Sequence, residues 1–218
     1  MLEIGGRPFL EYLVVQLRKA GVRRIVLATG YGADAVEAYF GDGRRHGVAI
    51  EHSREAEPLG TGGALRLAAR RLPDQPVLAL NGDSVLAVNP TALLAVLAAW
   101  PGTATVLALR SVPDAARYGT VELGPDGRVT AFVEKSAAAS RWPGLVNAGI
   151  YAIAPGTLDA LPADAPSSFE RDLLPSLAAA GRLRGWTADA YFVDIGIPET
   201  LLALRADPTP LLDALGGC

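Results

Sequence analysis

The run Pro76-Val77-Leu78-Ala79-Leu80 constrains the fold more than any other feature, because it is apolar at every position rather than at alternate positions. Such a run predicts a strand buried on both faces, as in a parallel sheet that helices cover on both sides. Similar runs alternate with amphipathic helical stretches through the first half of the chain. The expected strands are 24–29 and about 48–51, and the expected helices are 7–20, 33–40 and from about 60 to 72. This alternation predicts an α/β fold with a Rossmann-like, mostly parallel sheet.

The second half of the sequence has shorter strand-like runs separated by turns. Gly124-Pro125-Asp126-Gly127 has the composition of a tight turn between two of them. A helix is expected at 168–180, and Pro198 is placed to open a final helix. The remaining expected strands are 104–110, 119–123, 128–134 and 191–195. We therefore expect α+β decoration on the sheet, within one domain that spans residues 1–218.

Charge and cysteine content narrow the range of functions. The 218 residues carry a formal net charge of -3, which gives no electrostatic footprint for nucleic acid and favours a small substrate. Cys218 is the only cysteine, so no disulfide can form within the chain and a reducing, cytoplasmic location is expected. No apolar run reaches the roughly 18 to 20 residues that a membrane-spanning helix needs, so no membrane partner is expected.

Two motifs indicate chemistry. The segment Pro58 to Leu65 is a glycine-rich turn that opens a helix, and Asn81-Gly82-Asp83 follows the apolar strand. Glycine lets a backbone approach a ligand closely, and a helix start offers free N–H groups to an anion. Asp83 is expected at the carboxyl edge of the sheet, where α/β proteins bind ligands. Together the motifs predict a nucleotide and a metal ion, whereas singly they fit a plain loop and a turn carboxylate.

Six motifs in sequence order resemble those of the sugar-phosphate nucleotidyltransferase family, and within it those of the guanylyltransferases that act on manno-heptose or mannose 1-phosphate. They are Pro58 to Leu65, Asn81-Gly82-Asp83, Arg117-Tyr118-Gly119-Thr120-Val121, Phe132-Val133-Glu134-Lys135, Val146-Asn147-Ala148-Gly149-Ile150-Tyr151 and Val193-Asp194-Ile195-Gly196-Ile197-Pro198. The resemblance implies that a sugar 1-phosphate oxygen attacks the α-phosphorus of a nucleoside triphosphate, GTP by this likeness, to give an NDP-sugar and pyrophosphate. Such a displacement depends on positioning and charge neutralisation.

The resemblance further implies that Asp83 and Asp194 hold Mg²⁺. Their chemistry agrees, because Mg²⁺ is a hard ion that is usually bound by one or two carboxylates together with phosphates and water. Each aspartate follows an apolar strand, and two adjacent strands would bring both to one edge. The structural alternatives are a turn residue for Asp83 and a helix cap for Asp194.

Lys135 is expected to be catalytic together with Asp83. Of the 20 basic residues only Lys19 and Lys135 are lysines, so a compact point charge rather than an arginine fork stands beside Glu134. The resemblance places a sugar-phosphate contact on Lys135. Chance placement of one of two lysines is the structural alternative.

The remaining site residues come from the same resemblance. It implies that Gly60, Thr61, Gly62, Gly63, Asn81 and Gly82 bind the nucleotide. It also implies that the sugar side is formed by Tyr118, Gly119, Glu134, Lys135 and Asn147. A carboxylate such as Glu134 suits sugar hydroxyls because it accepts their hydrogen bonds. Tyr118 equally fits a half-buried core aromatic.

The start of the chain departs from the family. Members open with a strand and a loop of the form G-G-x-G-T-R-L, followed by a Pro-Lys pair; Met1 to Pro8 resembles what comes directly afterwards. Because the first strand of a doubly wound sheet is central, its absence predicts two neighbouring strands with unpaired edges and exposed apolar faces. We interpret the sequence as a fragment with an upstream start. The alternative is a catalytically deficient homologue that binds a nucleotide or NDP-sugar. Association into a homo-oligomer is common in the family.

Overall fold

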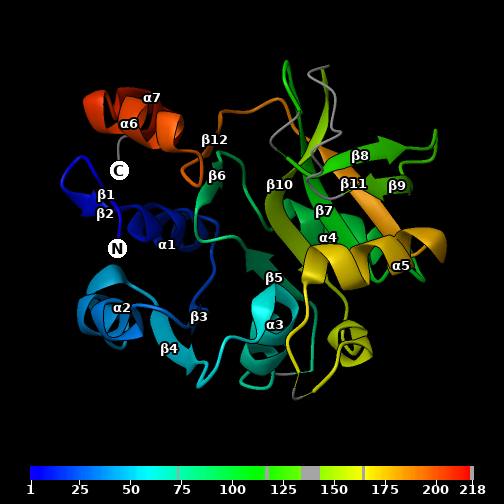
Figure 1. Cartoon of the computed structure of the whole chain (residues 1–218), viewed down its shortest axis with the longest axis horizontal. Helices are drawn as coiled ribbons and strands as arrows, with labels where there is room; N and C mark the ends of the chain where they lie inside the picture. The colour runs from blue at the N-terminus through cyan, green and yellow to red at the C-terminus, as the bar shows by residue number, and fades with distance from the viewer. Residues whose placement is uncertain (73, 116–117, 134–142, 164, 217–218) are drawn as a thin grey trace.

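A computed structural model describes residues 1–72, 74–115, 118–133, 143–163 and 165–216 (Figure 1). The elements of the first half are β1 (Glu3–Ile4), β2 (Arg7–Pro8), α1 (Phe9–Lys19), β3 (Arg24–Thr29), α2 (Ala33–Phe40), a 3₁₀ turn (Arg44–His46), β4 (Ala49–Arg54), α3 (Gly60–Ala69), β5 (Val77–Leu80), β6 (Ser84–Leu86) and α4 (Ala92–Ala99). No helix in these described ranges is long and apolar enough to cross a membrane.

The second half carries longer strands. Its elements are β7 (Thr105–Val112), β8 (Thr120–Leu123), β9 (Val129–Val133), β10 (Gly144–Ile153), a 3₁₀ turn (Thr157–Ala160), a π-helical turn (Phe169–Leu173), α5 (Leu174–Ala179), β11 (Leu183–Thr187), β12 (Phe192–Asp194), α6 (Pro198–Ala206) and α7 (Thr209–Ala214). The strands expected at 104–110, 119–123, 128–134 and 191–195 are all found within a residue or two of these bounds.

Strand β10 organises the sheet. It runs antiparallel to β5, β7 and β8, while β11 lies parallel to β7 and β9 pairs antiparallel with β8. Strands β5, β7, β8 and β11 therefore share one direction, and β10 runs against them. The predicted α/β class with a Rossmann-like, mostly parallel sheet is confirmed.

Strands β3 and β5 each have an open edge. Strand β3 pairs with β4 in parallel and β5 pairs with β10, and among the described residues no strand occupies the other edge of either. The unpaired edges predicted from the sequence are therefore present. The expectation that β5 is buried on both faces is wrong, because Val77, Leu78 and Leu80 are only half-buried. The open edge explains this exposure, since it borders a cavity.

Helix α1 fixes the turn that carries Asp83. The helix begins directly after Pro8, which is its N-cap, with φ −56° and an extended ψ of 135°. The buried Gln16 donates from Nε2 to the carbonyl oxygens of Leu86 at 2.6 Å and Val88 at 2.9 Å. Because β6 begins one residue after Asp83, these bonds hold the carboxylate's strand against the helix.

Candidate functional site

Asp83 and Asp194 border the same small space. Strand β12 pairs antiparallel with β6 so that Asp194 lies opposite Ser84, and the Ile195 N–H donates to the Asp83 carbonyl at 2.9 Å. A Cβ built on Gly196 would lie 2.9 Å from Asp194 Oδ1 and 3.3 Å from Asp83 Oδ2. The two carboxylates, which are distant in sequence, therefore meet at one edge, as the sequence predicted.

Short-range hydrogen bonds orient both carboxylates. Ser84 Oγ donates to Asp83 Oδ1 at 3.2 Å, and the Gly196 N–H donates to Asp194 Oδ1 at 2.7 Å. Asp194 is buried, with 8% of its surface exposed, whereas Asp83 is exposed. The helix-cap alternative for Asp194 is not observed, because Ile197 occupies the N-cap of α6 and no side chain caps that helix.

The carboxylate pair suits a hard cation that draws its other ligands from elsewhere. Within the described ranges no group of three or more His, Cys, Asp or Glu side chains gathers as a metal cluster. Two carboxylates are nevertheless what a magnesium site usually takes from a protein when phosphates and water complete its octahedron. The donor set therefore fits Mg²⁺ bound together with a phosphate-bearing ligand.

Asn81 is joined to the sugar-side motif. Its N–H donates to the Gly149 carbonyl at 2.8 Å, and its side chain lies over Gly149. Gly149 has a φ of 74°, and any Cβ there would come within 3.0 Å of Asn81 Cβ. In turn, the Asn147 N–H donates to the Gly119 carbonyl at 3.0 Å, and Asn147 Oδ1 accepts the Gly149 N–H at 3.1 Å. Three of the motifs thus converge through β10.

The glycine-rich segment is part of α3 rather than a turn before it, since Gly60 is the first helical residue. A Cβ at Gly60 would meet the Ser167 carbonyl oxygen at 2.5 Å, and one at Gly62 would meet Ser167 Oγ at 2.8 Å. The Gly62 N–H also donates to the Ser167 carbonyl at 2.8 Å. The glycines therefore permit close packing of α3 on the residues before the π-helical turn, a structural role that the sequence analysis did not consider.

Glu170 connects the two halves of the site, and the sequence analysis did not identify it. Thr61 Oγ1 donates to Glu170 Oε2 at 2.6 Å, and Tyr151 Oη lies 3.5 Å from Glu170 Oε1. Asn147 Nδ2 donates to the same Tyr151 hydroxyl at 2.6 Å. A predicted nucleotide-side residue and a predicted sugar-side residue are therefore linked through one carboxylate and one buried phenol.

Of the other predicted site residues, the structure describes Tyr118 and Gly82 but not Glu134 and Lys135. Tyr118 is half-buried, with its ring centroid 5.7 Å from that of Phe192, and it directly precedes Gly119. Gly82 is exposed and borders the cavity beside β5. Glu134 and Lys135 lie outside the described residues, so their expected places in the site stay predictions.

The fold and the paired carboxylates define an α/β protein with two aspartates at the carboxyl edge of its sheet, the edge at which proteins of this class bind ligands. The family model described as nucleotidyl transferase matches residues 1–209. The chain therefore belongs to the nucleotidyl transferase family, whose members are enzymes.

Curated relatives and solved structures agree with this family. The chain is 37% identical over 199 residues to D-glycero-alpha-D-manno-heptose 1-phosphate guanylyltransferase of Aneurinibacillus thermoaerophilus, covering 91% of this chain and 84% of that protein. It is 32% identical to mannose-1-phosphate guanylyltransferase of Mycobacterium tuberculosis over 97% of this chain and 60% of that one. The crystal structure of HddC from Yersinia pseudotuberculosis matches with a TM-score of 0.81 at 30% identity, covering 94% of this chain and 88% of that chain.

Proposed function

We propose that this protein transfers GMP from GTP to a manno-heptose or mannose 1-phosphate, giving a GDP-sugar and pyrophosphate. The meeting of Asp83 and Asp194 around Gly196 carries this proposal, because the reaction needs a cation at the phosphates and these carboxylates can hold one. The names of the similar proteins support guanine as the base and a manno-configured sugar.

In the proposed reaction a phosphate oxygen of the sugar 1-phosphate forms a bond to the α-phosphorus of GTP. The bond from that phosphorus to the bridging oxygen of the β-phosphate breaks, and pyrophosphate leaves with the electron pair. A bound Mg²⁺ would neutralise phosphate charge and orient the triphosphate. The chain's own part is to place the two reactants in line, because little covalent chemistry remains for the protein.

Each group of residues has a proposed task. Asp83 and Asp194 hold the cation, with Ser84 and the Gly196 N–H fixing their orientation. The start of α3, with Gly60 to Gly63 and Thr61, and the Asn81-Gly82 turn contact the nucleotide. Asn147, Gly119 and Tyr118 contact the sugar, with Glu134 accepting hydroxyl hydrogen bonds. Lys135 neutralises the sugar phosphate as a point charge.

The test is pyrophosphate release with Mg²⁺ from each of four nucleoside triphosphates against manno-heptose, mannose and glucose 1-phosphates. We expect GTP with a manno-configured phosphate to be preferred. D83N and D194N should each reduce turnover by at least about 100-fold, since a positioning and charge-neutralising group is lost. The exposed Asp213 on α7 provides the matched control D213N, which should retain full turnover. Unchanged turnover in D83N and D194N would refute the proposed roles.

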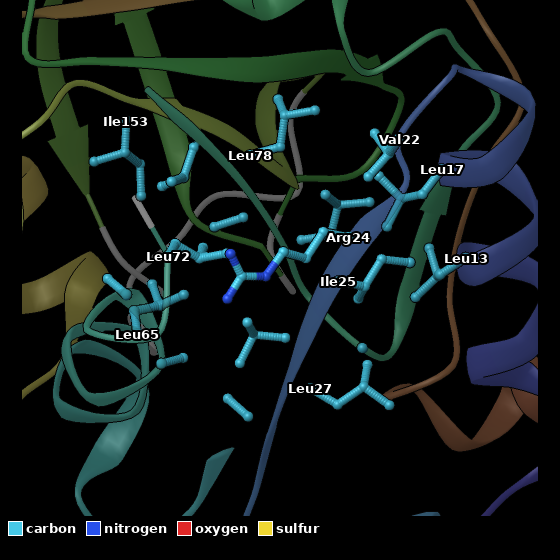
Figure 2. Close-up of a pocket in the computed structure, with 18 of the residues that line it drawn as sticks. Leu13, Leu17, Val22, Arg24, Ile25, Leu27, Leu65, Leu72, Leu78 and Ile153 are labelled. Carbon is cyan, nitrogen blue, oxygen red and sulfur yellow. The ribbon is translucent and has the colours of Figure 1, made fainter. Parts of the chain in front are cut away.

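One observation favours a second candidate, a homologue that binds a nucleotide or NDP-sugar without turnover. The cavity beside β5 (Figure 2) extends to Gly82, so there is space for a ligand in the cavity next to Asp83. Calorimetric binding of GTP or GDP-mannose, with no pyrophosphate released under any substrate pair, would support this candidate. The phosphorylated substrates and the lone cysteine both suit the cytoplasm, which the proposal includes.

A further inference from the structure

The turn that carries Glu170 is anchored by hydrogen bonds and by packing. Ser168 precedes this turn, and its N–H donates to Asp172 Oδ2 at 2.7 Å. The Phe169 ring is fully buried and meets the Tyr151 ring edge-on, with the two centroids 5.0 Å apart. Short π-helical segments of this kind are frequent at functional sites. The Glu170 carboxylate therefore has a defined position between the start of α3 and strand β10.

Chemistry fixes the direction of each hydrogen bond on the β10 side. Asn147 Oδ1 accepts the Gly149 N–H at 3.1 Å, so the amide turns its Nδ2 toward Tyr151. Because Nδ2 can only donate, the Tyr151 hydroxyl oxygen accepts this bond, at 2.6 Å. A carboxylate can only accept, so the single hydroxyl proton of Tyr151 is directed to Glu170 Oε1, 3.5 Å away. This is the longest of the three bonds, so it is the first to break when residue 170 changes.

The bonds on the α3 side have an equally fixed direction. Thr61 Oγ1 accepts the Phe169 N–H at 2.9 Å and lies 2.6 Å from Glu170 Oε2, so its only proton points to the carboxylate. Ser168 Oγ donates to the same carboxylate oxygen at 3.3 Å. Because its proton is used in this way, the Thr61 hydroxyl can offer a ligand only a lone pair, which accepts from an N–H or O–H group.

Two chains of hydrogen bonds thus end on Glu170. One runs from Asn147 through Tyr151, and the other comes from Thr61. Both are polarised toward the carboxylate, and an ionised acceptor makes stronger hydrogen bonds than a neutral one. A carboxylate accepts with both of its oxygens, whereas an amide of the same shape has one acceptor and one donor group. The chemistry of residue 170 therefore determines which groups the two chains present at their far ends.

We propose that Glu170 is a positioning residue that sets which hydrogen-bonding groups the site presents to its two substrates. With the carboxylate in place, Asn147 presents its second amide N–H to an oxygen of the sugar. Thr61 presents a lone pair to a donor group of the nucleotide. This inference rests on the proposed function, which assigns Asn147 to the sugar and Thr61 to the nucleotide.

The substitution E170Q tests this polarity, because the amide keeps the shape of the side chain. Two hydroxyl groups donate to Oε2, so the amide oxygen takes that side and the amide NH₂ faces Tyr151. The Tyr151 hydroxyl then meets donors on both sides, and Asn147 is no longer held in one orientation. We expect the KM for the sugar 1-phosphate and the KM for GTP each to rise about fivefold, with kcat within about twofold of wild type.

The substitution Y151F separates the two chains of hydrogen bonds. It removes the hydroxyl but keeps the ring that packs on Phe169, so the KM for mannose 1-phosphate should rise about fivefold while the KM for GTP stays unchanged. Y39F is its matched control, because Tyr39 of α2 also donates to a carboxylate, Glu11 Oε2 at 2.5 Å, outside the site. E122Q, at an exposed glutamate of β8, is the control for E170Q. Pyrophosphate release with Mg²⁺ should give wild-type KM values for both controls.

A second readout needs no substrate. In the ultraviolet resonance Raman spectrum, the intensity ratio of the tyrosine Fermi doublet is higher for a hydroxyl that only accepts than for one that also donates. The difference between wild type and Y151F isolates the signal of Tyr151, and the difference between E170Q and the double variant E170Q/Y151F isolates it in the presence of the amide. We expect this ratio to rise in E170Q.

Several results would overturn the proposal. One is an unchanged doublet ratio in E170Q, and another is a Y151F variant whose KM for GTP rises as much as its KM for the sugar phosphate. A lower thermal midpoint of E170Q with both KM values unchanged would show a purely structural role. If the wild type releases pyrophosphate from no substrate pair, the transferase function fails, and the Raman ratio alone then decides whether Glu170 sets the polarity of the site.

Discussion

The substitution G196A is the most direct test of the carboxylate pair, because the structure gives the distance between the added methyl group and each carboxylate. In G196A the new methyl group would lie 2.9 Å from Asp194 Oδ1 and 3.3 Å from Asp83 Oδ2, where ordinary contact begins at 3.4 Å. Asp194 Oδ1 must therefore move by about 0.5 Å, which exceeds the roughly 0.2 Å that metal–ligand distances tolerate. We expect cation affinity to fall about tenfold and turnover to fall about 10- to 100-fold.

The fold should survive this substitution. Gly196 is exposed and is not among the glycines with positive φ, and alanine keeps the N–H that Asp194 accepts. The thermal midpoint should stay within about 2 °C of wild type, as for other surface changes. Cation affinity is measured by titrating Mn²⁺ in the presence of GTP with electron paramagnetic resonance, which needs no turnover. G30A is the control, because its methyl group meets nothing closer than 3.6 Å. Wild-type Mn²⁺ affinity and turnover in folded G196A would refute the reasoning.

Three further predictions address other contacts. E170Q replaces a charged acceptor of the Thr61 hydroxyl by a neutral one, so the KM for GTP should rise about fivefold with a smaller change in kcat; steady-state kinetics that show no change would contradict this. Q16L leaves two backbone carbonyls without their donor and should lower the free energy of unfolding by about 2 kcal/mol, measured by urea titration. Burial lowers the pKa of His46 below its ordinary 6.5, so the unfolded chain binds protons more readily and stability present above that pH is lost as the pH falls. H46Q should therefore lose less stability than wild type between pH 7.5 and pH 5.5, and an equal loss would argue against this cause.

The sheet was predictable only in part: β5, β7, β8 and β9 carry local signals, whereas β10 (Gly144–Ile153), which organises the sheet, and β11 (Leu183–Thr187) were not predicted. The uniformly apolar run at 76–80 indicated a strand in a covered sheet, and its half-burial could not be foreseen without knowing what lies at its edge. The unpaired edges of β3 and β5 were expected from the family resemblance, because a doubly wound sheet without its central first strand leaves two neighbouring strands unpaired. Strand β6 was also missed, because three residues are too few to show a period.

The site was predictable only in part. The resemblance of their motifs to those of the family identified Asp83 and Asp194 as a pair. No spacing in the sequence predicts that two residues so far apart lie close together, and it is the pairing of β6 with β12 that brings them together. Glu170 lies in the first turn of a helical segment, where an acidic residue is ordinarily explained by its favourable interaction with the helix dipole. Its bond to Thr61 arises from tertiary packing, which the sequence does not display.

An irregularity in β10 separates the part of the strand that pairs with β5 in the core from the part that carries Asn147. Between Asn147 and Tyr151 the register against β7 shifts, so that four residues of β10 advance past two of β7. Beyond it, Ile150 to Ile153 keep their pairing with β5 in the core, whereas the earlier part carries Asn147, whose Nδ2 donates to Tyr151 Oη at 2.6 Å. With Asn147 in its proposed contact with the sugar, substitutions before the bulge would alter the choice of sugar while the interior stays in register, so this half of the strand is a place where new specificities can evolve.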